Sequence, residues 1–307
     1  MKRKAYGRDT GLSLRMLATG GLLGLLYVVF ALVLIQFIGG SFYVGLIIVG
    51  GIAIFQYFSS AKLALLASGA KVVERDQAPA LHDMVERLCA MADLPKPKVA
   101  IIDTHVPNAF ATGRNPKNAA VAVTTGLWET LEPQEVEGVI AHELAHISNR
   151  DVLIMTLASF FAMLAGLITR FAMYAGLFGG DRDRNGPPVW LIVLVVSAIT
   201  YVLSYILIRM ISRYREYAAD RGAALITGAP ENLMSALQKI AGSMTAIPKR
   251  DLREVESMNA FFIVPTNQHF SARDSLAEIF STHPPLEKRL ANLANIAREM
   301  GRPVEFG

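Results

Sequence analysis

The sequence is poor in cysteine and in charged residues. Its 307 residues include a single cysteine, Cys89, and 18% charged residues, against 52% hydrophobic ones. One thiol excludes an internal disulfide and a zinc cluster built from several cysteines, and Cys89 lies on an apolar stretch where we expect it to pack. The mean hydropathy of +0.37 is too high for an ordinary soluble protein and indicates a membrane protein.

Positive charge is in slight excess, with a formal net charge of +4. The excess is not accompanied by a basic stripe interleaved with aromatic residues, which argues against a nucleic-acid partner. Much of the positive charge lies beside hydrophobic stretches instead, as in membrane proteins whose Lys and Arg residues mark the cytoplasmic side. Membrane topology therefore explains the charge better than nucleic-acid binding does.

Four apolar stretches approach the roughly 20 residues that a helix needs to cross a bilayer. They cover residues 16–38, 42–58, 152–178 and 189–208. The second is short and rich in glycine, so it can alternatively form a re-entrant segment or a tightly paired hairpin. The first is longer than a signal-peptide core and is expected to be retained. Basic residues precede the first stretch and follow the fourth, which predicts that both termini and both long polar segments are cytoplasmic.

The apolar stretches divide the chain into two membrane hairpins and two polar segments, in the order 1–58, 59–151, 152–208 and 209–307. The two polar segments together are expected to form one split, cytoplasmic domain. Local patterns predict a helix over 71–92, strands over 98–102, 108–113 and 119–125, and a helix that opens at Pro133. The fold class is therefore α+β and mostly helical, with about four transmembrane helices and a small β-sheet.

The motif His142-Glu143-Leu144-Ala145-His146 has the form H-E-x-x-H and lies on a stretch with helical character. Residues four apart face the same way on a helix, so His142 and His146 can hold one metal ion. Two neutral imidazoles suit Zn²⁺, and Glu143 can reach a water on that ion as a general base. The motif therefore predicts one zinc ion and hydrolytic chemistry.

A catalytic zinc ion normally takes a third protein ligand, and the second polar segment offers one. Glu216 and Asp220 are i and i+4 on a stretch with helical character after the fourth apolar stretch, so they share a helix face. We expect Glu216 to be the third ligand and Asp220 to orient a ligand imidazole through its other ring nitrogen. The alternative is a solvated, charged helix at the membrane edge.

Several motifs together resemble the HtpX-type membrane zinc metalloproteases, over almost the whole chain. The matching segments are NAFATG at 108–113, HELAHISNRD at 142–151, EYAAD at 216–220 and THPPLEKR at 282–289. The resemblance implies His142, His146 and Glu216 as zinc ligands and Glu143 as catalytic base. It also implies that the split cytoplasmic domain is a zincin-like protease domain. The protein is then a multi-pass endopeptidase in the cytoplasmic membrane of a prokaryote, which acts in quality control of misfolded or damaged membrane proteins.

The resemblance also implies a strand that binds substrate. In related enzymes an edge strand lies antiparallel to the substrate backbone, which assigns Asn108, Ala109, Phe110 and Ala111 to polypeptide binding. An ordinary strand and turn is the alternative for this segment. His283, which precedes two prolines, is either a donor to the transition state or part of the start of a helix.

Three other functions fit parts of the sequence. An intramembrane metalloprotease also uses H-E-x-x-H, but there the motif lies inside a hydrophobic span, whereas Glu132, Glu135 and Glu137 precede His142 here. A protease of prenylated CAAX proteins shares the zinc motifs but encloses a chamber with more spans than this chain can build. A membrane scaffold with a structural zinc normally needs four protein ligands, and no convincing fourth is present. The expected partners are therefore polypeptide substrates and the lipid bilayer.

Overall fold

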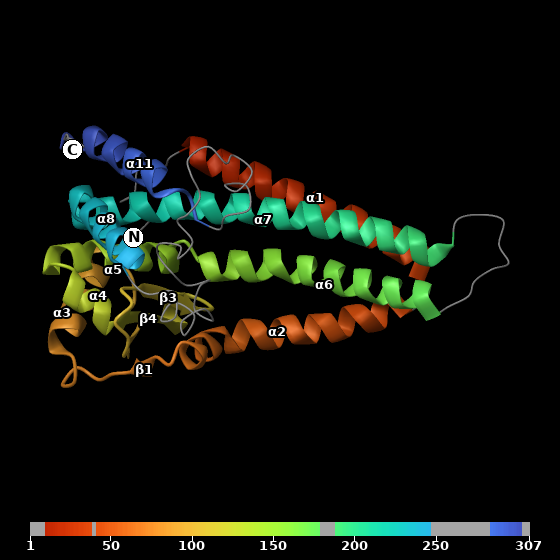
Figure 1. The fold of residues 1–307 in the computed structure, drawn as a ribbon, viewed down its shortest axis with the longest axis horizontal. Coiled ribbons are helices and arrows are strands. Elements are labelled where there is room, and N and C mark those ends of the chain that lie inside the picture. The colour runs from red at the N-terminus through yellow and green to blue at the C-terminus, as the bar shows by residue number, and fades with distance from the viewer. Residues whose placement is uncertain (1–9, 39–40, 179–187, 247–282, 303–307) are drawn as a thin grey trace. The chain divides into compact units, whose positions relative to one another are not determined.

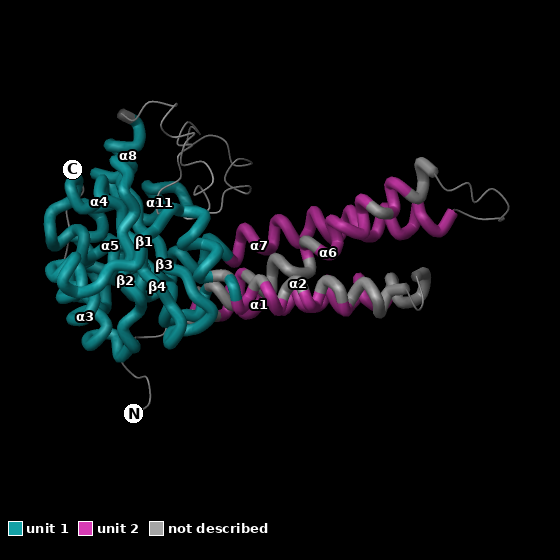
Figure 2. Tube along the Cα trace, turned by 90° about the horizontal axis from the view of Figure 1, so that it is seen from below, with its two compact units in different colours: residues 1–8, 59–153, 212–307 teal, residues 9–58, 154–211 magenta. Residues whose placement is uncertain are grey.

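The computed structural model describes residues 10–38, 41–178, 188–246 and 283–302. The chain forms two compact units, which Figure 2 draws in different colours. The first unit consists of residues 1–8, 59–153 and 212–307, and the second of residues 9–58 and 154–211. Each unit is thus assembled from segments that lie far apart in the sequence. The basic residues at positions 2–8 lie outside the described part.

Helices form the second unit. It contains α1 (Thr10–Ile38), the first part of α2 (Ser41–Ala67), most of α6 (Asp151–Phe178) and the first part of α7 (Val189–Thr227) (Figure 1). All four apolar stretches of the sequence are therefore helical. Among the described residues, the segments Leu14–Leu32 and Val189–Thr227 are long and apolar enough to cross a membrane, with mean hydropathies of 1.8 and 2.6. By length and composition, these two are candidate membrane helices.

Three helices of the second unit pack through an apolar cluster, and a hydroxyl contact joins two of them. Phe30 of α1 belongs to a buried cluster with Ala165 of α6 and Val193 of α7. Thr169 Oγ1 donates a hydrogen bond to Ser197 Oγ at 2.9 Å, which joins α6 to α7. Small residues let apolar helices approach closely, and a hydroxyl bond between helices contributes roughly 1 kcal/mol in a bilayer.

The first unit contains a four-stranded mixed sheet. Its strands, in the order β1-β2-β4-β3, are β1 (Lys71–Val72), β2 (Lys98–Ile102), β4 (Ala119–Thr124) and β3 (Ala109–Gly113). β2 and β4 are parallel, whereas β1 and β3 run antiparallel to their neighbours. Because β3 is an edge strand, one row of its backbone N–H and C=O groups is not used by the sheet.

The structure corrects the helix expected over residues 71–92. β1 occupies Lys71–Val72, and α3 (Pro79–Met91) begins only at Pro79. Proline lacks an N–H and is tolerated in the first turn of a helix, but it keeps the residue before it out of the helical conformation. Ala78 accordingly has φ −145° and ψ 63°. The prediction of one continuous helix was therefore wrong for residues 71–78.

Helices pack against the sheet and against one another, and with it they form the main core. They are α3, α4 (Thr125–Thr130), α5 (Pro133–Ser148), α8 (Pro230–Ala246) and α11 (Leu286–Glu299), with a 3₁₀ helix, Pro116–Asn118, between β3 and β4. α5 lies close against α8 because Gly138 has no side chain: a Cβ there would lie 2.9 Å from the backbone nitrogen of Leu233. Lys239 Nζ also lies 2.8 Å from the Glu135 carboxylate, which ties α8 to the first turn of α5. The motif helix is thus fixed from one side by α8.

Candidate metal centre

α5 presents the two histidines of the motif toward a common point. His142 and His146 lie one turn apart, and their Nε2 atoms are separated by 3.1 Å. The two rings are nearly perpendicular, with an interplanar angle of 89°. His142 is buried and His146 is nearly so. Two imidazole nitrogens that face each other so closely can direct their lone pairs at one ion.

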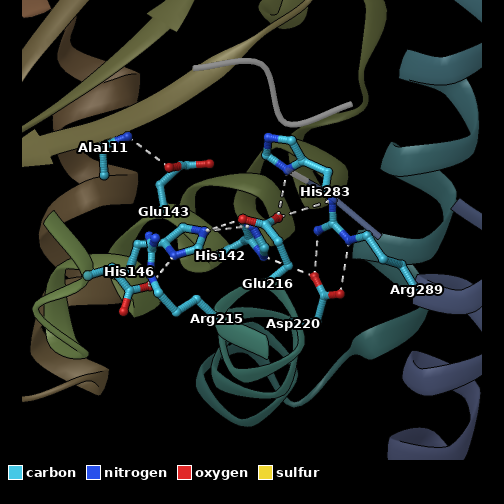
Figure 3. A network of polar contacts seen from close by, with 10 residues as sticks. Ala111, His142, Glu143, His146, Arg215, Glu216, Asp220, His283 and Arg289 are labelled. Carbon is cyan, nitrogen blue, oxygen red and sulfur yellow. Dashed lines mark hydrogen bonds and ion pairs between the residues drawn. The ribbon is translucent and has the colours of Figure 1, made fainter. Parts of the chain in front are cut away.

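The last part of α7 brings a carboxylate to the same point. Glu216 Oε2 lies 3.6 Å from Nε2 of His142, and Glu216 Oε1 lies 3.6 Å from Nε2 of His146 (Figure 3). One ligand atom from each of the three residues lies within 4.8 Å of the other two. Gly222 permits this approach, because a Cβ there would lie only 2.6 Å from Cβ of Ala145, inside the motif.

The observed distances fit a tetrahedral metal ion. A zinc–nitrogen distance of about 2.0–2.1 Å places two ligands of a tetrahedral ion about 3.3 Å apart. The separations of 3.1 Å between the imidazoles and 3.6 Å to the carboxylate bracket this value. Two imidazoles and one carboxylate are also donors that divalent transition metals accept. The residues present can therefore hold one such ion.

Asp220 lies behind His142, with its Oδ1 atom 3.0 Å from Nδ1 of the ring. Arg289 of α11 binds this carboxylate twice: Nη2 donates to Oδ1 at 2.6 Å and Nε donates to Oδ2 at 3.0 Å. Burial alone would raise the pKa of Asp220, but Arg289 and His142 lower it, so the carboxylate is ionised. The sequence pattern singled out Asp220 and gave no role to Arg289, the last residue of the segment 282–289.

A second carboxylate lies behind His146. Oδ2 of Asp151, the first residue of α6, is 2.6 Å from Nδ1 of His146. Nε of Arg215 lies 3.1 Å from the same oxygen. Sequence reasoning gave no role to Asp151 and counted Arg215 only among the basic residues that follow the fourth apolar stretch. The signal was visible, because the acid follows the second histidine by only five positions.

Glu143 lies beside the three potential ligands and faces β3. Its Oε2 atom accepts a hydrogen bond from the N–H of Ala111 at 2.7 Å (Figure 3). Burial raises the pKa of Glu143 above the ordinary value for a glutamate. A carboxylate with a raised pKa is better matched to accept and return a proton near neutral pH.

The backbone N–H and C=O groups of the expected substrate strand alternate between the β4 side and the free edge of the sheet. The N–H of Asn108 donates to Thr124 Oγ1 at 2.8 Å, and its C=O accepts from the N–H of Thr124 at 2.9 Å. Asn108 is therefore bound to the β4 side. Backbone groups alternate along an antiparallel strand, so Phe110 also pairs with β4, whereas Ala109 and Ala111 direct their N–H and C=O groups to the free edge.

His283 lies just before α11, on the side of the centre opposite Glu143 (Figure 3). Its Nδ1 atom is 3.2 Å from Glu216 Oε2, and Nη1 of Arg289 is 3.6 Å from the same oxygen. Burial alone would raise the pKa of Glu216, but His283 and His142 hold it well below its ordinary value. The structure thus brings the expected ligands, the expected base and His283 into one cluster.

A buried helix that presents two imidazoles and a carboxylate beside a later acidic residue defines the site of a metallohydrolase. A family model described as Peptidase family M48 matches residues 75–297 of this chain. The chain therefore belongs to peptidase family M48 and is a metalloprotease.

Curated relatives match nearly the whole chain. Protease HtpX homolog 2 of Methanosarcina acetivorans is 51% identical over 300 residues, which cover 98% of this chain and 100% of that protein. The HtpX homolog of Moorella thermoacetica is 52% identical over 300 residues (97% and 98%), and homolog 1 of Streptomyces coelicolor is 50% identical over 296 residues (96% of each). These relatives support an HtpX-type, membrane-bound metalloendopeptidase rather than a scaffold.

A solved structure has a similar fold. The chain resembles S. mikatae Ste24p with a TM-score of 0.53 and 19% sequence identity. The comparison covers 93% of this chain and 65% of that one. At this identity the likeness concerns the fold alone, namely a mostly helical molecule with a small sheet.

Proposed function

We propose that the protein is a zinc endopeptidase whose ion is held by His142, His146 and Glu216. The observation that carries this proposal is the convergence of the three ligand atoms within 4.8 Å of one another, with Glu143 beside them. Three protein ligands leave one position open, as catalytic zinc sites do, whereas structural sites normally use four. Imidazole donors favour zinc over magnesium or calcium, which take oxygen ligands.

When bound, the ion supplies a Lewis acid that lowers the pKa of a coordinated water and polarises the peptide carbonyl. Glu143 takes the proton from the attacking water and returns it to the leaving amine. The N–H of Ala111 fixes the Glu143 carboxylate in place. His283, on the far side of Glu216, donates a hydrogen bond to the oxygen that becomes negative in the transition state.

The free edge of β3, within the expected substrate strand Asn108 to Ala111, binds the substrate backbone. Ala109 offers an outward N–H and C=O, and Ala111 offers an outward C=O while its N–H holds Glu143, so an extended peptide can add to the sheet there. Main-chain pairing makes little demand on the sequence of the substrate, and it requires an unfolded segment. We therefore infer that the substrates are misfolded or damaged proteins, including membrane proteins.

The chain also spans the membrane four times in this proposal. Its hairpins are residues 1–58 and 152–208, and the two segments 59–151 and 209–307 form the protease domain. The excess of Lys and Arg next to the apolar stretches supports a cytoplasmic position for that domain and for both termini. The host membrane is then the cytoplasmic membrane of a prokaryote.

Metal analysis of purified wild type, Glu216→Ala and Glu143→Gln, each assayed for casein cleavage, tests the proposal. We expect one zinc ion per chain in the wild type, loss of zinc and activity in Glu216→Ala, and zinc without activity in Glu143→Gln. Zinc retained in Glu216→Ala would refute the ligand set, and casein cleavage at the wild-type rate by Glu143→Gln would refute the base.

Two further measurements separate the rival functions. Removal of the metal with a chelator and its return should abolish and restore proteolysis, whereas a scaffold would lose its fold and show no activity in either state. Cleavage of an unprenylated cytosolic loop, compared with a prenylated peptide, distinguishes general proteolysis from the processing of CAAX proteins.

A further inference from the structure

The side of His146 away from the metal centre faces a buried ion pair. Asp151 Oδ2 lies 2.6 Å from Nδ1 of the ring, and Nε of Arg215 lies 3.1 Å from that oxygen. The Asp151 side chain is 1% exposed. We propose that Asp151, held in place by Arg215, is a positioning residue that fixes the orientation and tautomer of His146 for metal binding. This inference rests on the proposed function of His146 as a ligand.

The chemistry of imidazole makes such a partner necessary. A neutral imidazole binds a metal through the nitrogen that lacks a proton. A carboxylate that accepts a hydrogen bond from Nδ1 keeps the proton there and leaves the Nε2 lone pair free. Nε2 of His146 is the atom that lies 3.1 Å from Nε2 of His142, so Asp151 directs the correct nitrogen toward the shared point.

The arrangement around His146 repeats the one around His142. Asp220 lies 3.0 Å from Nδ1 of His142 and is bound by Arg289. Each imidazole thus has its own buried carboxylate, and each carboxylate has its own arginine. A buried carboxylate without a cation would be strongly disfavoured. Each arginine therefore supplies the cation that its buried carboxylate requires.

The backbone between α5 and α6 is shaped to bring the acid back to the ring. α5 ends at Ser148, and Arg150 has φ 57°, in the left-handed region that costs a non-glycine residue roughly 1 kcal/mol or more. This turn places Asp151, the first residue of α6, beside His146. Arg215 comes from α7 and directly precedes Glu216 (Figure 3). Two neighbouring residues of α7 therefore supply the ligand Glu216 and the cation that holds Asp151 beside His146.

A purely structural role for Asp151 is the alternative. An acid in the first turn of a helix is stabilised by the helix dipole, and Asp151 has this place in α6. In that case its removal would lower the stability of the protein without changing the metal affinity of the folded molecules. Glu231 provides a matched control, because it lies in the first turn of α8 and pairs with Arg302 at 2.9 Å.

The test measures Zn²⁺ affinity of the full-length apoprotein in detergent by competition with a chelator, together with the visible spectrum of the Co²⁺ form. Asp151→Ala should bind Zn²⁺ about 10–100-fold more weakly than the wild type and should alter the Co²⁺ bands. Asp151→Asn keeps the shape and an acceptor oxygen but loses the ion pair, so a smaller loss, on the order of threefold to tenfold, is expected. Glu231→Ala should bind as the wild type does.

The arginine is tested in the same assay. Arg215→Ala should weaken Zn²⁺ binding, and Arg215→Lys should restore part of the affinity, because the charge is kept near Asp151 while the fixed guanidinium geometry is lost. If Asp151→Ala does not fold, Asp151→Asn decides the question. Wild-type affinity and an unchanged Co²⁺ spectrum in a folded Asp151 variant would overturn the inference.

The two proposals fail in different ways. If the wild type binds no Zn²⁺, or if Glu216→Ala binds it as tightly, the proposed function itself is wrong. If the wild type binds Zn²⁺ and Glu216→Ala does not, while both Asp151 variants bind as Glu231→Ala does, only the role of Asp151 is wrong.

Discussion

Replacing Gly222 by alanine would place a methyl group between α7 and α5. The new Cβ would lie 2.6 Å from Cβ of Ala145, whereas carbon atoms pack at about 3.5–4.0 Å. Neither atom is the movable end of a long side chain, so the two helices must separate locally by about 1 Å. Such overpacking costs about 1–3 kcal/mol of folding free energy.

The same displacement reaches the metal centre. Glu216 and His142 lie on the two helices that must separate, and metal sites tolerate ligand distances within only about 0.2 Å of the ideal. We therefore expect Gly222→Ala to weaken Zn²⁺ binding by at least about tenfold. Proteolysis should fall with metal occupancy and recover in part when Zn²⁺ is supplied in excess.

Gly242→Ala is the matched control, because Gly242 lies on α8 and a Cβ there meets nothing within 4 Å. Alanine in a helix is favoured over glycine by about 1 kcal/mol, so this variant should be slightly more stable than the wild type. Both variants replace a helical glycine by alanine, so comparing Gly222→Ala with Gly242→Ala cancels the gain in helix propensity. Zn²⁺ affinity is measured by chelator competition and stability by thermal unfolding in detergent.

A double variant identifies the contact itself. Ala145→Gly removes the atom that Gly222→Ala would meet, so the double variant should bind Zn²⁺ more tightly than Gly222→Ala alone. The reasoning is refuted if Gly222→Ala binds Zn²⁺ as Gly242→Ala does, or if Ala145→Gly gives no recovery.

Three further predictions concern the core around the site. Gly138→Ala should lower stability by about 1–3 kcal/mol in thermal unfolding, because its Cβ meets the Leu233 backbone, which cannot rotate away; an unchanged melting temperature would contradict this. Burial alone would raise the pKa of Glu135, but Lys239 helps to lower it. The stabilisation from the Lys239–Glu135 ion pair is therefore present at neutral pH and is lost as Glu135 is protonated. Lys239→Ala should therefore destabilise by roughly 1 kcal/mol or less at pH 7, and this difference should disappear as the pH falls through the lowered pKa of Glu135. A loss independent of pH would refute the pairing. Burial raises the pKa of the Cys89 thiol to about 11, so iodoacetamide should label it only after unfolding, as mass spectrometry can check.

Local patterns were enough to predict the motif helix and most strands. Pro133 and the H-E-x-x-H spacing concern neighbours along one helix, and α5 begins at that proline. The helix expected over 71–92 was wrong at its start because β1 is stabilised by pairing with β2, and Lys71 lies opposite Ile101. Such a partner leaves no periodic signal in the segment itself, while the effect of Pro79 on Ala78 could have been recognised.

The arginines of the metal centre were beyond prediction for a related reason. Arg289 and Asp220 are 69 positions apart, and charged residues on an amphipathic helix usually face solvent. Only the packing of α11 near the end of α7 turns Arg289 inward, where it is 2% exposed. Asp151 differs, because its distance from His146 along the chain is short and the turn at Arg150 alone decides whether it can reach the ring.

The arrangement on α7 explains why some substitutions at this centre should displace several groups of the metal site and others only one. Arg215, Glu216, Asp220 and Gly222 keep fixed angles on one helix, about 100° for each residue. A shift at Gly222 therefore moves the ligand Glu216, the partner of His142 and the arginine beside Asp151 together. A change at Arg289 acts differently. Arg289 lies on α11 and binds Asp220, so its replacement affects mainly the orientation of His142. Gly222→Ala should therefore weaken Zn²⁺ binding even in an Arg289→Lys background, whereas the effects of Arg289 and Asp220 variants should not add, because both act through the same ring.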